Sequence, residues 1–270
     1  MNPLLIARNL RAEYLKLLKT AFAPRQEDLA ASFHAAIEKD GFLTREPFIA
    51  LAQPFEHAGP IDGLLPETRA RFGPIAERPY RHQADACRRI LDGLPTVVAT
   101  GTGSGKTEAF LMPIVDHCLR ARRSGGGDVV RAILIYPMNA LANDQCGRIR
   151  KLLDGTPVTF GRYTGETRLA GTRPADAPAN ERVLRAEFHE RPPDLLLTNY
   201  LMLEYMLMRK DGREIFKGHR VRYIVLDEVH TYHGTLGTDV ACLMRRLRNV
   251  LRKYRTELDP VLIEIGRAHV

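Results

Sequence analysis

Two short apolar runs in this chain each end in a nucleotide-handling motif, and this pair limits the possible folds more than any other feature. The first run, Val97–Ala99, continues into Thr100-Gly-Thr-Gly-Ser-Gly-Lys-Thr107. The second run, Tyr223–Leu226, continues into Asp227-Glu-Val-His230. A glycine-rich loop after one strand and acidic residues after another are typical of proteins that bind phosphates and magnesium. We therefore expect an ATPase fold in which the two strand ends meet.

From about residue 80 onward, short apolar runs alternate with segments of helical pattern. The expected strands span 96–100, 131–136, 157–162, 194–198 and 222–227. The expected helices span 81–92, 106–122, 139–153, 179–189, 200–209 and 237–255. The apolar runs lack polar alternation, as in strands that are buried on both faces of a sheet. This alternation predicts an α/β fold, with a parallel sheet flanked by helices and ligands bound at the carboxyl ends of the strands.

The first 75 residues have a different, mainly helical pattern. Apolar side chains recur at helical spacing at Leu10, Tyr14, Leu17, Leu18 and Phe22. Glycine and proline then accumulate between residues 54 and 79, which is typical of loops. We expect a helical accessory segment over residues 1–75 and one ATP-binding domain over residues 76–264.

The chain is basic, with 40 Lys and Arg against 32 Asp and Glu and a net charge of +8. A basic balance favours a polyanion as partner, although a solvated basic surface explains it equally well. The 4 cysteines have no C-x-x-C spacing, which favours reduced thiols over a zinc site or a disulfide framework. No apolar run reaches the roughly 18–20 residues of a membrane span, and the N-terminus lacks a signal-peptide pattern. We expect a cytoplasmic protein without a membrane partner.

The loop after the first apolar run has the composition of a phosphate-binding loop. Gly103 and Gly105 allow the backbone N–H groups to close around phosphates, and the following helix adds its dipole. Lys106 would reach the β- and γ-phosphates of ATP, and Thr107 would place its hydroxyl on Mg²⁺. The other candidate contacts in this loop are Thr100, Gly101, Thr102 and Ser104. The strict pattern has glycine in place of Thr100, and an ordinary glycine-rich turn is the alternative.

Two acidic residues follow the second apolar run. Asp227 would hold Mg²⁺ directly or through water, and Glu228 would orient and polarise the attacking water. The alternative is an exposed Asp-Glu pair that caps the next helix. The presence of the phosphate loop in the same chain favours the catalytic interpretation.

These two motifs, together with Gln83 upstream, resemble the superfamily 2 DEAD/DEAH-box helicases, which are P-loop NTPases with RecA-like domains. The resemblance implies that Gln83 reads the adenine edge and that Tyr80 could stack on the adenine ring. Packing at the start of a helix is the alternative for Tyr80. The resemblance also implies that His230 links the ATP site to the partner domain and the nucleic acid.

Three further segments resemble the loops with which this family contacts nucleic acid. Residues 136–145 are similar to motif Ia, although Met138 and Asn139 replace the Thr and Arg that are usual there. Residues 163–167 resemble the next loop of the family, and residues 197–200 stand at the position of motif Ib. The candidate contacts are Pro137, Asn139, Ala140, Thr164, Gly165, Thr198 and Asn199. The alternative for these Thr and Asn side chains is a helix-capping role.

The narrowest resemblance is to the YprA/MrfA-type bacterial helicases, through residues 198–209 and 227–234. It implies ATP-driven movement along a single strand of nucleic acid, with DNA favoured over RNA and with ATP and Mg²⁺ as cofactors. It also implies a second RecA-like domain, which closes the ATP cleft. Two alternatives stay open: an ATP-driven double-stranded DNA translocase subunit of a restriction or phage-defence complex, and a non-catalytic nucleic-acid-binding scaffold.

The last residues of the chain have an unusual sequence. We expect a strand to begin near Val261 and a Ser-Ala-Thr motif to follow it, but the chain continues as Ile265-Gly-Arg-Ala-His-Val270. One reading frame of a widely used short-read sequencing adapter encodes these six residues. We therefore expect residues 265–270 to be a non-native tail, and this chain to bind nucleotide weakly and hydrolyse it poorly.

Overall fold

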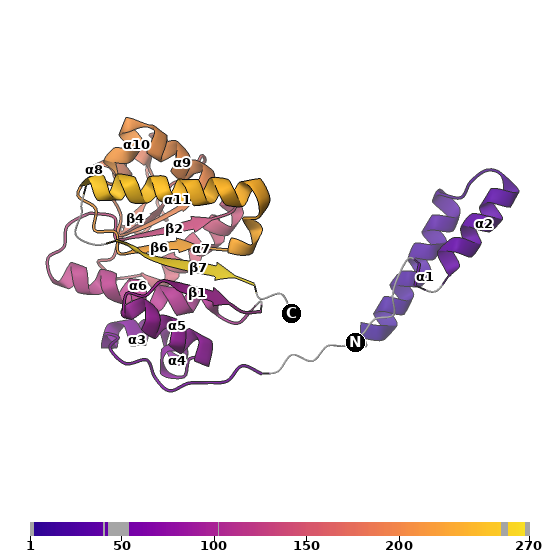
Figure 1. Cartoon of the computed structure of the whole chain (residues 1–270), viewed down its shortest axis with the longest axis horizontal. Helices are drawn as coiled ribbons and strands as arrows, with labels where there is room; N and C mark the ends of the chain where they lie inside the picture. Colours follow the sequence, from indigo (N-terminus) through magenta and orange to yellow (C-terminus); the bar gives the residue numbers. More distant parts are fainter. Residues whose placement is uncertain (1–2, 40, 43–53, 102, 255–258, 268–270) are drawn as a thin grey trace. The chain divides into compact units, whose positions relative to one another are not determined.

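The structure is a computed structural model that describes residues 3–39, 41–42, 54–101, 103–254 and 259–267. The chain forms two compact units, Met1–Pro54 and Phe55–Val270. In the first unit, helices α1 (Pro3–Ala21) and α2 (Glu27–Glu38) follow one another (Figure 1). An ion pair between Lys19 and Glu38 joins the two helices. The expected helical character of this N-terminal segment is confirmed.

The chain divides at Pro54, earlier than the boundary that we expected near residue 75. The glycine- and proline-rich stretch belongs to the second unit, where it forms helices α3 (Pro66–Phe72) and α4 (Pro74–Glu77). Proline suits the first position of a helix, since its missing N–H is not needed there. The buried Asp116 carboxylate anchors this stretch: its Oδ1 accepts hydrogen bonds from Leu65 N at 2.6 Å and Thr68 Oγ1 at 2.8 Å.

The second unit is built on a seven-stranded sheet with the order β1-β7-β6-β2-β5-β3-β4, and every pair of neighbours is parallel. The strands are β1 (Thr96–Ala99), β2 (Ala132–Tyr136), β3 (Phe160–Arg162), β4 (Glu181–Arg182), β5 (Leu195–Asn199), β6 (Tyr223–Leu226) and β7 (Val261–Gly266). The predicted α/β fold with a parallel sheet is confirmed. Because β1 and β6 are both parallel to β7, which lies between them, the two motif-bearing strands end at the same edge of the sheet.

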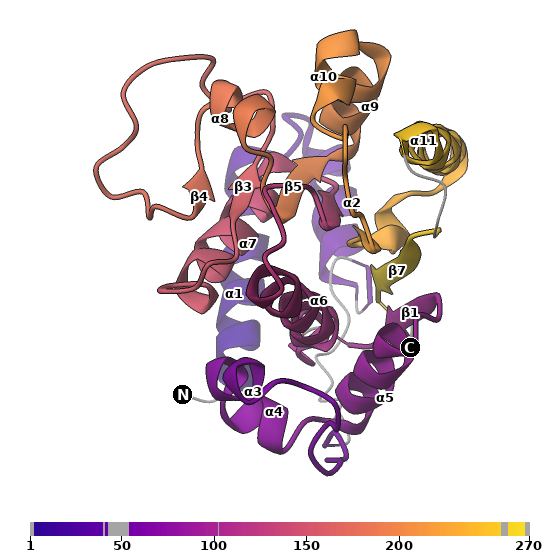
Figure 2. The ribbon, with the colours of Figure 1, turned by 90° about the vertical axis from the view of Figure 1, so that its left-hand side faces the viewer.

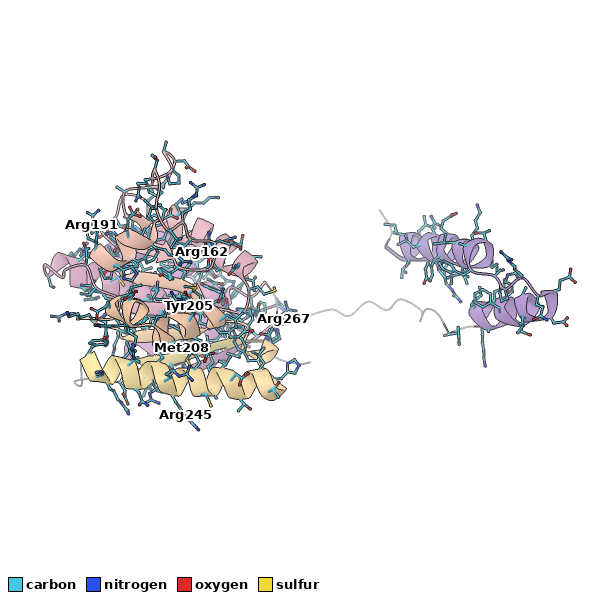
Figure 3. All side chains as sticks on the ribbon, turned by 90° about the horizontal axis from the view of Figure 1, so that it is seen from above. Arg162, Arg191, Tyr205, Met208, Arg245 and Arg267 are labelled. Carbon is cyan, nitrogen blue, oxygen red and sulfur yellow. The ribbon has the colours of Figure 1, made fainter. Side chains whose placement is uncertain are left out.

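Helices cover both faces of this sheet (Figures 1 and 2). One face carries α5 (Arg81–Leu91), α6 (Lys106–Arg123) and α7 (Asn139–Leu152). The other carries α8 (Arg185–Glu190), α9 (Tyr200–Met208), α10 (Lys210–Glu214) and α11 (Gly234–Tyr254). Helix α11 buries an apolar stripe, whereas Arg245 extends outward from it (Figure 3). Within the described residues, no helix is both long and apolar enough to span a membrane.

Two parts of the expected pattern differ from the structure. The helix expected over 179–189 begins only at Arg185, because Glu181 and Arg182 pair with β3 as strand β4. Strand β7 continues through Ile265 and Gly266, which pair with Val98 and Ala99 of β1. These two residues of the expected tail are therefore part of the sheet. Residues 268–270 lie outside the described residues, and the non-native origin of the tail stays a prediction.

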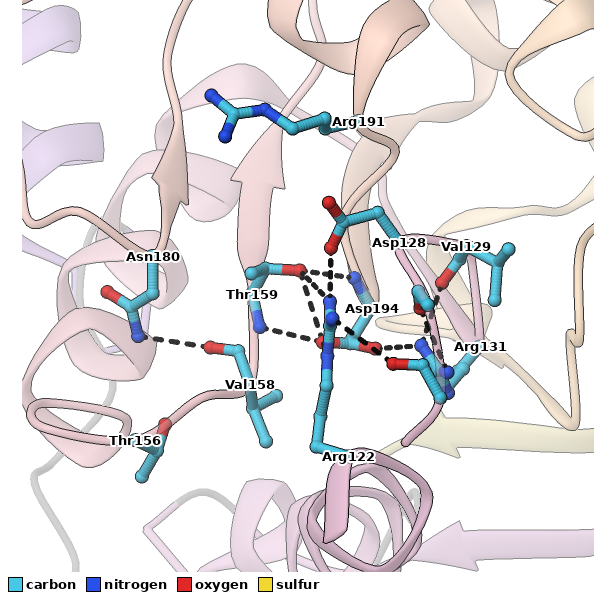
Figure 4. Close-up of polar contacts among 12 residues, drawn as sticks. Arg122, Asp128, Val129, Arg131, Thr156, Val158, Thr159, Asn180, Arg191 and Asp194 are labelled. Atoms are coloured by element: carbon cyan, nitrogen blue, oxygen red, sulfur yellow. Dashed lines mark hydrogen bonds and ion pairs between the residues drawn. The ribbon is translucent and has the colours of Figure 1, made fainter. Parts of the chain in front are cut away.

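A buried ionic network holds the amino ends of three strands together (Figure 4). The Asp194 carboxylate, just before β5, is fully buried and forms an ion pair with Arg131, just before β2. It also accepts hydrogen bonds from Arg122 Nε at 2.8 Å and from the backbone N of Thr159 at 2.8 Å. Every carboxylate oxygen therefore has partners, which is the condition under which a buried charge is tolerated.

Replacing this carboxylate is expected to destabilise the fold strongly. Asp194→Ala removes the buried carboxylate that Arg122 and Arg131 share, and breaking such a buried pair costs about 3–5 kcal/mol of unfolding free energy. Denaturant unfolding followed by circular dichroism measures the loss. The control is Asp259→Ala, whose exposed carboxylate pairs with Arg248 and Arg252 and should matter far less. Equal losses in the two variants would contradict a structural role for the network.

Candidate nucleotide site and nucleic-acid face

The loop between β1 and α6 has the backbone of a phosphate-binding loop. Gly103 and Gly105 adopt φ angles of 75° and 72°, in the left-handed region that favours glycine. A Cβ on Gly105 would lie 2.3 Å from Nε2 of Gln83, so no larger residue fits there. Thr100, which occupies the position of the usual glycine, hydrogen-bonds through Oγ1 to Ser104 Oγ at 2.5 Å. Thr102 lies outside the described residues.

Lys106 lies at the start of α6 and turns its ammonium back into the loop. Its Nζ donates to the carbonyl oxygens of Thr100 at 3.0 Å and Gly101 at 2.9 Å. Phosphate oxygens of a nucleotide would compete with these two carbonyls for the same ammonium group. Thr107 follows at the first turn of α6 and faces the same cavity as Lys106.

Asp227 stands at the carboxyl end of β6 in a poorly solvated position. Burial raises the pKa of its carboxyl group to about 6, and the nearby charge of Glu228 acts in the same direction. The backbone N of Glu228, which donates to Asp227 Oδ1 at 2.8 Å, and the charge of Lys106 oppose that rise. A cation bound at this carboxylate would favour the ionised form.

Glu228 has an unusual backbone conformation. Its φ of 51° and ψ of 45° are left-handed, and among the described residues it is the one non-glycine with positive φ. The short 3₁₀ helix over Val229–Thr231 holds this turn, with Thr231 N donating to the Glu228 carbonyl at 2.8 Å. The Glu228 carboxylate lies 3.2 Å from Nε2 of His230. Left-handed strain of this kind is concentrated at functional sites.

A cavity of about 620 Å³ connects these elements. Among the expected site residues, Tyr80, Gln83, Gly103, Ser104, Gly105, Lys106, Thr107 and Glu228 line it. Asp227 and His230 do not line it, but both are beside Glu228. The sequence interpretation missed several lining residues, namely His57, Pro74, Ile75, Arg78, Glu108 and Arg148. Glu108 could have been found, since it directly follows Thr107.

Gln83 connects the start of α5 to the phosphate loop. Its Oε1 accepts from the backbone N of Tyr80 at 2.8 Å, and its Nε2 donates to the carbonyl of Gly105 at 2.8 Å. Only 3% of Gln83 is exposed, so its amide is largely used within the protein. The ring of Tyr80 lies 4.7 Å from that of His57 and 5.2 Å from that of Phe55, centroid to centroid. Tyr80 thus packs at the helix start and also faces the cavity.

The expected nucleic-acid contacts gather at the carboxyl ends of β2, β3 and β5. Nδ2 of Asn199 donates to Oδ1 of Asn139 at 2.6 Å, and Nδ2 of Asn139 donates to Oε1 of Glu166 at 3.0 Å. Oδ1 of Asn199 also accepts from the backbone N of Met202 at 2.7 Å, which caps α9. The structure therefore brings the three segments together, and Asn199 has the capping role as well.

The threonines of these segments are less available than we expected. Thr164 and Thr198 are fully buried, and Thr198 Oγ1 donates to the carbonyl of Tyr163 at 2.8 Å. Their hydroxyls stabilise the loops, so exposed neighbours such as Ala140 and Gly165 form the accessible surface, beside the half-buried Pro137. Glu166, which the sequence interpretation did not single out, adds a negative charge to this face. The hydrogen bond from Asn139 is the main cause of the lowered pKa of the Glu166 carboxyl group.

Comparisons with known proteins agree with these features. A family model of the DEAD/DEAH box helicases matches residues 80–259. The chain is 30% identical to Druantia protein DruE of Escherichia coli (strain UMEA 4076-1), over 90% of this chain and 19% of that protein. It is also 30% identical to the uncharacterized ATP-dependent helicase YprA of Bacillus subtilis (strain 168), over 68% of this chain and 22% of that protein. The chain thus spans about a fifth of the length of these two relatives.

Two solved structures show the same architecture. The crystal structure of the DUF1998 helicase MrfA bound to DNA and AMPPNP has a TM-score of 0.64 and 25% identity, covering 80% of this chain and 28% of that one. The Mycobacterium smegmatis helicase Lhr bound to ssDNA and AMP-PNP has a TM-score of 0.59 and 26% identity, covering 77% of this chain and 25% of that one.

The raised pKa of Asp227 predicts that magnesium-dependent nucleotide binding weakens in acid. Below a pKa of about 6 the carboxyl is protonated and neutral, so the gain in ATP affinity from Mg²⁺ should fall by up to about tenfold per pH unit. Titration calorimetry with and without Mg²⁺ between about pH 5 and 8 measures this gain. ATP itself also takes up a proton in this pH range, and this contribution is the same for the parent and for Asp227→Asn. The variant is therefore the control. An equal pH dependence in parent and variant would contradict the assignment.

Proposed function

The chain belongs to the DEAD/DEAH box helicase family, and on that premise we propose that it forms the first ATP-binding domain of an ATP-dependent helicase. The observation that carries the proposal is the single cavity to which the phosphate loop and Glu228 both contribute. Two motifs far apart in the sequence meet there with the chemistry that phosphoryl transfer requires. A second RecA-like domain of the same protein would supply the other wall of the cleft.

The residues present fit ATP and magnesium. Lys106 would bind the β- and γ-phosphates after leaving the carbonyls of Thr100 and Gly101, and the loop N–H groups would surround them. Thr107 and Asp227 would hold Mg²⁺, which would neutralise phosphate charge. The described residues contain no cluster of three His, Cys, Asp or Glu that could bind a metal alone, so phosphate oxygens would complete the coordination.

Hydrolysis would depend on Glu228 and its neighbour His230. Glu228 would orient and polarise the attacking water, and its left-handed backbone turns it toward the cavity. His230, 3.2 Å from that carboxylate, is placed to transmit its position to a partner domain. Gln83 would contribute to the base end of the site and hold Gly105 in place.

We further propose that the polar cluster of Asn139, Asn199 and the exposed backbone near Gly165 contacts a single strand of nucleic acid. The cluster lies at the carboxyl edge of the sheet, where ligands of parallel sheets bind. DNA is favoured over RNA because the solved relatives MrfA and Lhr are bound to DNA and ssDNA. The net charge of +8 also favours a polyanion.

A substitution at Glu228 tests the helicase proposal. In a longer protein that also contains the second domain, single-stranded DNA should stimulate ATP hydrolysis, and Glu228→Gln should lower kcat by about 100-fold or more. ATP affinity should change little, since Glu228 acts on the water and not on the phosphates. If the parent protein shows no DNA-stimulated hydrolysis, the non-catalytic scaffold becomes the better interpretation.

A substitution at Glu166 tests the nucleic-acid face. Glu166→Gln removes a negative charge and frees Arg162, whose Nη1 lies 3.1 Å from that carboxylate. Affinity for single-stranded DNA should rise about two- to threefold, with a steeper salt dependence. Fluorescence anisotropy at several salt concentrations measures both.

The matched control is Glu67→Gln, which removes a negative charge that pairs with Arg123 and Arg71 at the opposite edge of the sheet. The same gain in both variants would indicate general electrostatics and contradict the proposed face.

A further inference from the structure

The nucleotide cavity contains a cation that belongs to neither motif. Arg148 lies on α7 and lines the cavity together with the loop from Gly103 to Thr107. Its side chain is 45% exposed and forms an ion pair with Glu108 of α6. The described residues give Arg148 no other hydrogen-bond or ion-pair partner. Part of the guanidinium is therefore available to a ligand.

Glu108 fixes the position of this guanidinium. It directly follows Thr107, and only 7% of the residue is exposed. One carboxylate oxygen pairs with Arg148, whereas the other, Oε2, is buried without a hydrogen-bond partner and packs against Gly105. A carboxylate buried in this way has little freedom to move, so Arg148 is held at a defined place beside the loop.

The neighbours of Gly105 show which part of a nucleotide Arg148 would meet. A Cβ built on Gly105 would meet both Nε2 of Gln83, at 2.3 Å, and Oε2 of Glu108, at 3.2 Å. Gln83 accepts a hydrogen bond from Tyr80, which would lie at the base end of the cavity. Lys106 would lie at the end that holds the β- and γ-phosphates. Oε2 of Glu108 therefore lies beside Gly105, the loop residue that contacts Gln83 and precedes Lys106, so a nucleotide that extends from Gln83 to Lys106 would pass this carboxylate with its inner phosphate.

The chemistry of Arg148 suits that position. A guanidinium presents N–H donors in a fixed planar fork, so one side can hold a carboxylate while another binds a phosphate oxygen. Burial lowers the pKa of Arg148, because the charged form loses part of its water. An anion in the cavity would compensate that loss.

We propose that Arg148 binds the α-phosphate of the nucleotide and that Glu108 positions it there. This inference rests on the nucleotide site proposed above. Among the cations that line the cavity, Arg148 thus has a role distinct from that of Lys106: Lys106 binds the outer phosphates, whereas Arg148 contacts the phosphate that all adenine nucleotides share.

Titration calorimetry of the chain with ATP and with ADP tests this division of roles. Arg148→Ala should weaken ATP and ADP binding by the same factor, about tenfold, since both carry an α-phosphate. Lys106→Ala should weaken ATP binding more than ADP binding. Lys151→Ala removes an exposed cation from the same helix outside the cavity, and it should bind both nucleotides as the parent does.

The outcomes separate the inference from the nucleotide site itself. If Lys106→Ala loses ATP affinity but Arg148→Ala does not, or if Arg148→Ala weakens only ATP, the inference is overturned and the site stands. If neither variant loses affinity, the nucleotide site is wrong as well. Should thermal unfolding show that Arg148→Ala does not fold, Arg148→Gln keeps an uncharged polar side chain and carries the same expectation.

Discussion

The position of β7 is the constraint on which the whole site depends. Strands β1 and β6 carry the two nucleotide motifs but do not pair with each other, because β7 lies between them. Ala99 is opposite Gly266 on one side of β7, and Leu226 is opposite Glu264 on the other. This register sets the lateral separation between the phosphate loop and Asp227.

The two edges of the sheet differ in how completely their buried polar atoms are paired. At the amino edge, both carboxylate oxygens of Asp194 have arginine or threonine partners, and Nε of Arg131 is the one atom of these side chains that is buried without a hydrogen-bond partner among the described residues. At the carboxyl edge, within the described part of the chain, Oε2 of Glu108 and Nδ1 of His230 are buried without hydrogen-bond partners, and Oε2 of Glu228 has an ion-pair contact with Nε2 of His230 at 3.2 Å but no hydrogen bond. Unsatisfied buried atoms are costly, and proteins tolerate them where a ligand or a partner contributes the missing contact. The unpaired atoms of Glu108 and His230 are therefore open to such a contact at the edge where we propose that the nucleotide binds.

The sequence was sufficient for those parts of the fold that local patterns encode. Apolar runs such as Tyr223–Leu226, bounded by turn residues and alternating with helical segments, predict strands that are buried on both faces. The spacing of the loop glycines predicts a phosphate-binding loop. Strand β4 could not be predicted, since its two residues, Glu181 and Arg182, are charged and owe their burial to partners such as Arg150 and Asp128. The domain boundary was misplaced for a similar reason. Proline and glycine between residues 54 and 79 suggested a linker, but Asp116, distant in sequence, orders that stretch.

Within the site, too, the sequence predicts the residues of the motifs but not the residues that tertiary contacts bring to the cavity. Motif residues such as Lys106 and Glu228 are recognisable because the chemistry of phosphates restricts both residue type and spacing. His57 and Arg148 are placed only by tertiary pairing: His57 by a bridge to Tyr80, and Arg148 by an ion pair to Glu108. Neither contact leaves a local signature, because the partners belong to different elements. If the proposed function is correct, the motifs specify the groups at the reacting end of the nucleotide, whereas the packing of α5, α6 and α7 determines which groups would contact the rest of it.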